Sequence, residues 1–216
     1  MSCSGDDHAP EAMPRWRVGA NYGWFGSELR FDGTYDFDIE RRGLTATLER
    51  RLSPKTSLQI AAGGVFGGSL QGLGQRYTLG PGWLLAGSFS WTTLDGRGDG
   101  PFLIFSASLG VSSARTELQR PHVPEPATVA LVAVDGRFGL TVGKALWQHV
   151  APYASLRAFG GPVFWEVAGV DVTGTDRNHY QVAAGVTVLS GRGLDVYVEG
   201  APLGERALAV GAGFAF

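Results

Sequence analysis

The chain has 216 residues, which fits a single domain. Its 18 basic and 20 acidic side chains give a net charge of -2, so it lacks the basic surface by which proteins bind nucleic acid. Intrinsic disorder is excluded, because 44% of the residues are hydrophobic, 11% are aromatic and the net charge is small. No apolar run approaches the roughly 18 residues of a transmembrane helix.

Bulky apolar residues alternate with small or polar ones along most of the chain, which is the two-residue period of β-strands. The alternation is clearest at the C-terminus, where one face carries Leu208, Val210, Ala212, Phe214 and Phe216. The opposite faces are poor in the lysines that soluble sheets expose, since the chain has only Lys55 and Lys144. We therefore expect the bulky faces to contact lipid.

Turn-forming residues divide this pattern into ten segments. They are Arg15–Phe25, Phe37–Leu52, Ser57–Phe66, Gly82–Leu94, Phe102–Thr116, Thr128–Lys144, Pro152–Trp165, Tyr180–Leu189, Leu194–Gly200 and Arg206–Phe216. Most are long enough for a tilted strand to cross a bilayer, and short connections alternate with longer ones. The sequence predicts an all-β fold, a single closed antiparallel up-and-down transmembrane β-barrel of about ten strands.

We expect residues 15–216 to form this barrel and residues 1–14 to form a disordered periplasmic tail. An even number of strands places both termini on the periplasmic side and the longer loops outside the cell. In the second segment, Phe37 and Ile39 are out of phase with Leu44, Ala46 and Leu48. A one-residue bulge near Arg42-Gly43 would restore the phase.

Aromatic residues lie near the ends of the predicted strands, where outer-membrane barrels carry aromatic girdles. One girdle would contain Trp16, Trp91, Trp147 and Tyr153, and the other Trp24, Trp83, Trp165 and Tyr180.

The C-terminal pattern from Leu208 to Phe216 resembles the last strand of Gram-negative outer-membrane barrels, which ends in a lipid-facing aromatic residue. The resemblance implies that the barrel-assembly machinery recognises these five residues and that outer-membrane lipid surrounds the chain. It covers the last strand closely and the rest of the chain only through its architecture.

Charged residues on the inward faces suggest how the lumen is filled. The set contains four arginines and four carboxylates, namely Arg17, Glu49, Arg51, Asp135, Arg137, Arg157, Asp195 and Glu199. Because unpaired charges in a narrow lumen are costly, we expect these groups to pair and largely to plug it. Small residues such as Gly63, Gly139 and Gly185 would leave at most a thin path.

These features favour a structural barrel that presents its outer loops or docks a partner protein there. A narrow channel for water, ions or very small solutes is the alternative in the transport class. A hydrolase at the rim would use Asp176 and His179, with Asp171 and Thr173 close by. The histidines are dispersed, so we predict no metal site, no cofactor and no catalytic residues.

Two outer loops stand out. Gly67–Pro81 is unusually apolar, and we expect it to form a lid over the barrel or to contact a partner. Glu117–Ala127 contains three prolines and should be extended and stiff. A soluble ligand-binding barrel is the remaining alternative, and it requires a bulky apolar lumen with a polar exterior.

Overall fold

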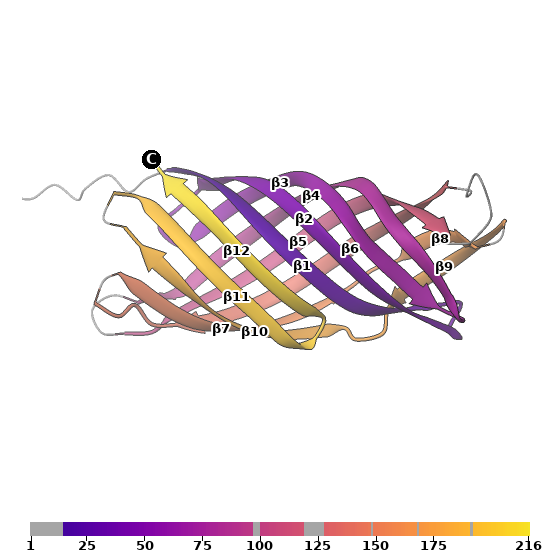
Figure 1. Ribbon diagram of the computed structural model, residues 1–216. Coiled ribbons are helices and arrows are strands. Elements are labelled where there is room, and N and C mark those ends of the chain that lie inside the picture. The colour runs from indigo at the N-terminus through magenta and orange to yellow at the C-terminus, as the bar shows by residue number, and fades with distance from the viewer. Residues whose placement is uncertain (1–14, 97–99, 119–127, 148, 168, 191) are drawn as a thin grey trace, which may run out of the picture.

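The structure is a computed structural model that describes residues 15–96, 100–118, 128–147, 149–167, 169–190 and 192–216. These residues form twelve antiparallel strands in one closed sheet (Figure 1). The strands are β1 Trp16–Phe31, β2 Tyr35–Arg51, β3 Thr56–Gly72, β4 Gln75–Asp95, β5 Phe102–Leu118, β6 Thr128–Gly143, β7 Val150–Gly160, β8 Val163–Val167, β9 Val170–Asp176, β10 Tyr180–Leu189, β11 Leu194–Gly204 and β12 Arg206–Ala215. In the part of the chain that the structure describes, no helix is long and apolar enough to cross a membrane.

The sheet closes twice, because β1 and β6 each pair with different strands along their length. Residues Arg17 to Gly26 of β1 pair with β12, and residues Gly136 to Gly143 of β6 pair with β7. This closure gives a ring of ten strands, β1–β7 and β10–β12. Farther along, β1 pairs with β9 and β6 pairs with β8, so the β8–β9 hairpin completes a second ring of eight strands.

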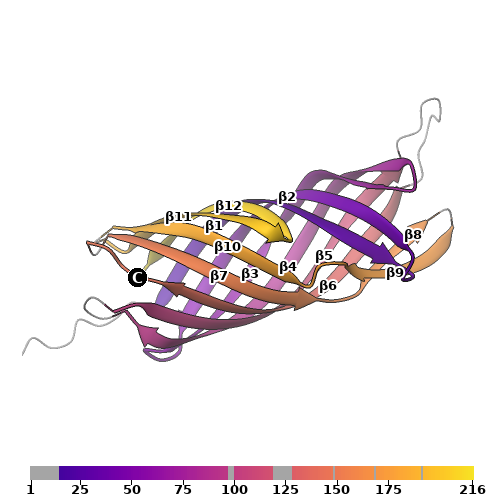
Figure 2. The same cartoon turned by 90° about the horizontal axis from the view of Figure 1, so that it is seen from below.

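The two rings lie at opposite ends of the barrel. We call the end where β1 begins and β12 ends the near end, and the end with β8 and β9 the far end (Figures 1 and 2). The β11–β12 hairpin stops partway along the barrel, whereas β1 to β6 continue to the far end (Figure 2). The prediction of about ten strands is confirmed for the ring that contains both the first and the last strand.

The outer surface of the ten-strand ring is a belt of exposed apolar side chains. Among its members are Val18, Tyr22, Leu44, Leu48, Leu58, Ile60, Trp83, Leu85, Phe89, Phe105, Leu109, Phe138, Val142, Leu156, Val196, Val198, Leu208 and Val210. An exposed apolar surface of this extent is unfavourable in water and suits the hydrocarbon of a bilayer.

Beyond this belt the chemistry of the two faces is exchanged, as β2 shows. Toward the near end, Leu44 and Leu48 point outward, but toward the far end Phe37 and Ile39 are buried inside the barrel. The pairing of β1 with β2 is continuous along its whole length, so the strand itself does not slip. The prediction that a one-residue bulge in β2 near Arg42-Gly43 restores the phase is therefore wrong. The far end instead has an apolar interior and a polar exterior, like a barrel in water.

A register shift does occur opposite Arg42, but the extra residue belongs to β3. Phe66 and Gly67 together lie opposite Arg42, and Gly67 and Gly68 both have positive φ angles. A Cβ atom at Gly68 would lie 1.9 Å from the carbonyl oxygen of Glu40, so only glycine fits this bulge.

The longer loops expected outside are mostly strand. β1 and β2 are joined by residues 32–34 and β3 and β4 by Leu73-Gly74. The predicted strand Pro152–Trp165 is divided between β7 and the start of β8, and the end of β8 and all of β9 fall inside the predicted loop Glu166–His179. The loop Glu117–Ala127 lies outside the described residues from position 119 onward.

Candidate functional site

The interior of the far end is filled by an apolar cluster, which we call the far-end cluster. Its members are Leu29, Phe31, Phe37, Ile39, Val65, Leu70, Tyr77, Leu79, Ala114, Leu131, Val163 and Trp165. They come from every strand of the eight-strand ring except β9, whose Val172 packs against the cluster. A cluster of this size excludes water from the lumen at this end.

Trp165 lies at the centre of the far-end cluster and is 3% exposed. Its ring lies 4.8 Å from that of Tyr77 and 5.3 Å from that of Phe37, both edge-on. Its Nε1 donates a hydrogen bond to Thr116 Oγ1 at 2.9 Å, which satisfies the buried indole. The prediction that Trp165 belongs to an outward girdle is wrong, because β8 is a separate short strand that points this ring inward.

The predicted lid is also part of this cluster. Leu70, Tyr77 and Leu79 extend inward from β3 and β4, so the apolar residues of Gly67–Pro81 fill the lumen from its wall and do not close over it. Leu73, at the turn between these strands, is 63% exposed. The high apolar content of the segment thus reflects a core position.

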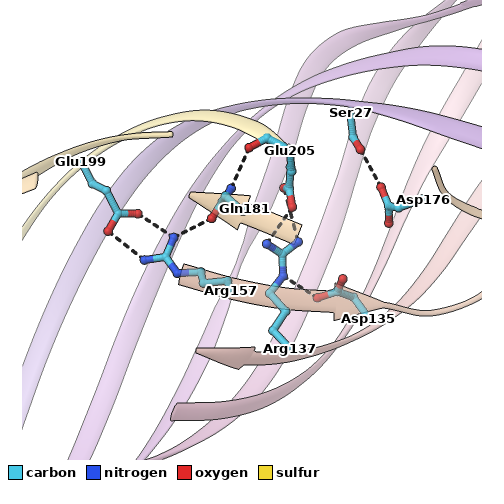
Figure 3. A network of polar contacts seen from close by, with 8 residues as sticks. All are labelled: Ser27, Asp135, Arg137, Arg157, Asp176, Gln181, Glu199 and Glu205. Atoms are coloured by element: carbon cyan, nitrogen blue, oxygen red, sulfur yellow. Dashed lines mark hydrogen bonds and ion pairs between the residues drawn. The ribbon is translucent and has the colours of Figure 1, made fainter. Parts of the chain in front are cut away.

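Toward the near end the interior becomes ionic (Figure 3). Arg157 on β7 forms a two-pronged ion pair with Glu199 on β11, with Nη–Oε distances of 2.7 and 2.8 Å. The same guanidinium donates to Gln181 Oε1 at 2.7 Å, and Gln181 Nε2 donates to the backbone oxygen of Glu205 at 3.1 Å. This network links three neighbouring strands and the β11–β12 turn.

Arg137 on β6 bridges two carboxylates (Figure 3). Its Nε donates to Asp135 Oδ1 at 2.6 Å, and its Nη1 lies 2.8 Å from Glu205 Oε2. The Glu205 side chain is only 3% exposed, and the Arg137 guanidinium also stacks 4.8 Å from the ring of Phe159. Glu205 is not among the predicted lumen charges, because it lies in the connection between the predicted strands Leu194–Gly200 and Arg206–Phe216.

A third group of charges lies closest to the near end. Arg17 on β1 donates from Nε to Asp195 Oδ2 at 2.8 Å, and its Nη1 lies 3.6 Å from Glu49 Oε2. Arg51, at the end of β2, is exposed. The structure thus brings the arginines and carboxylates assigned to the lumen on β1, β2, β6, β7 and β11 into ion pairs with one another or with Glu205. It places Arg51 at the rim.

Large side chains occupy the space that inward glycines leave on one side of the lumen. Tyr197 lies over Gly211 and Arg17 lies over Gly213, where an added Cβ atom would come within 2.5 and 2.3 Å of the respective side chain. Tyr153 likewise covers Gly185, so it points into the lumen and is not the girdle residue that was predicted. These glycines accommodate neighbouring side chains and do not leave a path.

The remaining predicted girdle residues are on the outside or at the turns. Trp16, Trp83, Trp91, Trp147 and Tyr180 are between 38% and 82% exposed, and Trp24 is half-buried. The C-terminal residues Leu208, Val210, Ala212, Phe214 and Phe216 are all exposed along one outward line, as the resemblance implied.

Asp176 and His179, the two residues proposed for a hydrolase at the rim, have different neighbours in the structure. Asp176 Oδ1 accepts a hydrogen bond from Ser27 at 2.7 Å, and burial raises the pKa of this carboxyl, which lies on β9 beyond the apolar belt. His179 is exposed, with its ring beside Gly160. Asp171 and Thr173 are exposed on β9. At the nearby β1–β2 turn, a hydrogen bond from Arg30 lowers the pKa of Asp36.

Within the described residues, no cluster of three or more His, Cys, Asp or Glu side chains is placed to bind a metal ion. His8, His122 and Cys3 lie outside those residues.

The fold can be compared with solved structures. The translocator domain of the autotransporter NalP from Neisseria meningitidis superposes with a TM-score of 0.54 at 15% identity, covering 97% of this chain and 90% of that one. The outer membrane protease OmpT from Escherichia coli gives a TM-score of 0.55 at 11% identity, covering 94% and 97%. The fold is that of a Gram-negative outer-membrane β-barrel.

No family model matches the sequence, and no curated protein does either. The identities above are low enough that the likeness concerns the barrel fold alone. Together with the apolar belt, this fold supports a location of the barrel in the bacterial outer membrane.

Proposed function

We propose that this chain is a structural outer-membrane barrel that holds its eight-strand ring at the cell surface, with a lumen closed to ions. The observation that carries the proposal is the far-end cluster, which fills the lumen from wall to wall. Below it, the ion pairs of Arg17, Arg137 and Arg157 occupy one side of the ten-strand ring. The cluster is part of the wall itself, so ions would have to displace packed core residues to pass.

We further propose how the barrel is oriented in the membrane and which segment directs its assembly. Both termini would lie in the periplasm, since the strands of the opposite, far end extend beyond the apolar belt into water, as the extracellular parts of outer-membrane barrels do. The outward line of residues from Leu208 to Phe216 would be the segment that the barrel-assembly machinery recognises. The polar exterior of the eight-strand ring would be the part of the barrel available to a protein partner.

Planar bilayer recording tests whether the lumen is closed. We expect the purified barrel to insert without discrete conductance steps, because the far-end cluster leaves no hydrated path. Insertion is verified by the heat-dependent gel mobility of protein recovered from the same vesicles. Reproducible steps from the unmodified chain would overturn the closed-barrel proposal in favour of the narrow channel.

Cysteine labelling tests the orientation. In a Cys3→Ser background, Gly33→Cys at the β1–β2 turn should react with a membrane-impermeant maleimide added to intact cells. The matched control Lys55→Cys, at the β2–β3 turn of the opposite end, should react only after the outer membrane is permeabilised. Gly33 suits substitution because no atom lies within 4 Å of an added Cβ, although its φ of +71° favours glycine. The reverse labelling pattern would contradict the proposed orientation.

A further inference from the structure

Between the far-end cluster and the near end, the lumen contains a cavity of about 300 Å³ lined mainly by β1 to β6. A smaller cavity of about 60 Å³ continues toward the far end, and Arg41, Asp135 and Arg137 line both. A cavity of about 150 Å³ is enough to bind benzene. The larger cavity therefore has room for a ligand of roughly ten non-hydrogen atoms.

Arg41 is the charged group that distinguishes this cavity. Its guanidinium lies 3.5 Å from Ser112 Oγ, at the limit of a hydrogen bond, and 5.7 Å from the centre of the Phe25 ring. In the described part of the chain Arg41 makes no ion pair, whereas Arg17, Arg137 and Arg157 are each held by carboxylates. A half-buried cation without a counter-ion is unfavourable, and an anion in the cavity would relieve that cost.

The charges around the larger cavity favour an anion. Arg41 and Arg137 line it from the inward faces of β2 and β6, against the single carboxylate of Asp135. Arg42 borders it only from the outward face of β2. Arg137 is already held by Asp135 and Glu205, so Arg41 is the inward cation that lacks an ion pair within the described residues. Asp176 and Glu205 line only the smaller cavity. Glu205 is paired with Arg137. Asp176 accepts a hydrogen bond from Ser27 and lies within electrostatic range of Arg41, but it forms no ion pair with Arg41.

The rest of the lining is largely apolar. Apolar lining residues include Phe25, Val65, Leu84 and Ala133. The uncharged polar exceptions are the amide of Asn21 and the hydroxyls of Thr45 and Ser112. A site with one free cation and an apolar wall matches a ligand with one anionic group and an apolar body. We propose that this cavity binds a small monocarboxylate with an apolar tail, with the carboxylate on Arg41 and the tail along Phe25, Val65 and Leu84.

A ligand would reach the cavity from the near end, because one side of the lumen there carries large side chains and the facing side carries small ones. The side made by β7, β10, β11, β12 and β1 carries the bulky lumen groups described above. The facing side, from β3 to β5, carries small hydroxyl residues that remain partly accessible, namely Ser57, Ser88, Ser90, Ser106 and Ser108. A ligand would enter along this hydroxyl-lined side and stop at the far-end cluster, so binding is compatible with a barrel closed to ions.

Octanoate, with about ten non-hydrogen atoms, is a suitable probe. Isothermal titration of the barrel in lipid nanodiscs, with empty nanodiscs subtracted, should show saturable binding. Arg41→Gln should weaken it by about 10- to 100-fold, since a charge-assisted hydrogen bond is lost. The matched control Arg50→Gln, which changes an exposed arginine over the Trp16 ring on the same strand, should leave binding unchanged.

Several results would overturn the proposal. The first is octanoate uptake no greater than that of empty nanodiscs, and the second is binding of octyltrimethylammonium as tight as that of octanoate. The third is binding of acetate as tight as that of octanoate, and the fourth is undiminished octanoate binding to Arg41→Gln. If Arg41→Gln fails to show the heat-dependent mobility of a folded barrel, Ala86→Phe replaces it. Ala86 lines the cavity, so the added ring should abolish binding without changing any charge, and unaltered binding would contradict the site.

Discussion

Replacing Trp165 with alanine is expected to release the β8–β9 hairpin while the ten-strand ring stays folded. The indole is buried against three aromatic rings and donates to Thr116, so its loss should cost about 3–5 kcal/mol. Because β8 and β9 are short and pair only at the far end, we expect this cost to appear as local opening. Hydrogen exchange of residues 163–176 should accelerate by about 100- to 1000-fold.

A control variant and a measurement of folding show whether the effect is specific to Trp165. Trp147→Ala removes an indole that is 82% exposed at the near end, and it should leave exchange in β8 and β9 unchanged. Heat-dependent gel mobility should be retained in both variants, because the ten-strand ring is intact. Unchanged exchange in Trp165→Ala would show that the far-end cluster does not hold the hairpin in place.

Replacing Arg137 with methionine is expected to destabilise the whole barrel by about 3–5 kcal/mol. Methionine preserves much of the packing against Phe159, but it leaves Asp135 and the buried Glu205 without their counter-ion. The β11–β12 turn, to which Glu205 belongs, should loosen first. Urea unfolding in lipid vesicles, followed by the loss of heat-dependent mobility, measures the change.

The cause can be separated by removing the orphaned charges as well. Arg137→Met combined with Asp135→Asn and Glu205→Gln should recover most of the lost stability, since the uncompensated charges are gone. Arg30→Met provides the control, because Arg30 pairs with Asp36 at an exposed turn and should contribute little. If the triple variant were no more stable than Arg137→Met, lost packing and not unpaired charge would explain the defect.

The sequence was most informative about the near end. There the apolar face must contact lipid and the opposite face must fit a narrow lumen, so the alternation persists until turn-forming residues interrupt it. Strand ends such as Phe102 and Leu189 are therefore predicted correctly. The same two-sided constraint led to the inward set of charges, because arginine and carboxylate in a lipid-facing position would be too costly. Which carboxylate each arginine contacts depends on strand register and could not be derived from the pattern.

The far end was mispredicted for a physical reason. Alternation distinguishes the two faces of a strand but does not show which face contacts water. The prediction places lipid around the whole length of the barrel. Phe37 and Ile39 on β2 were therefore read as out of phase, when they belong to an interior that is apolar because the exterior is aqueous. The short strands β8 and β9 were not predicted for a related reason, because the sequence pattern places Trp165 at the end of a longer membrane strand, Pro152–Trp165.

The same assumption hid Arg41. With a bulge at Arg42-Gly43, the inward face between Ile39 and Thr45 could not be assigned, and the one lumen arginine without an ion pair among the described residues went unnoticed. Glu205 and Gln181 became recognisable only when the β11–β12 turn was seen to fold against Arg137 and Arg157.

The outward face of β2 changes from apolar at the near end to charged at the far end, and this change also fixes the depth of the protein in the membrane. If the barrel moved deeper into the membrane, so that part of the far end left the water, the outward charges of Asp38, Glu40 and Arg42 would enter hydrocarbon. If it rose, Leu44 and Leu48 would be exposed to water. Both displacements are unfavourable, so a single strand carries the two opposing restoring forces that hold the barrel at one depth.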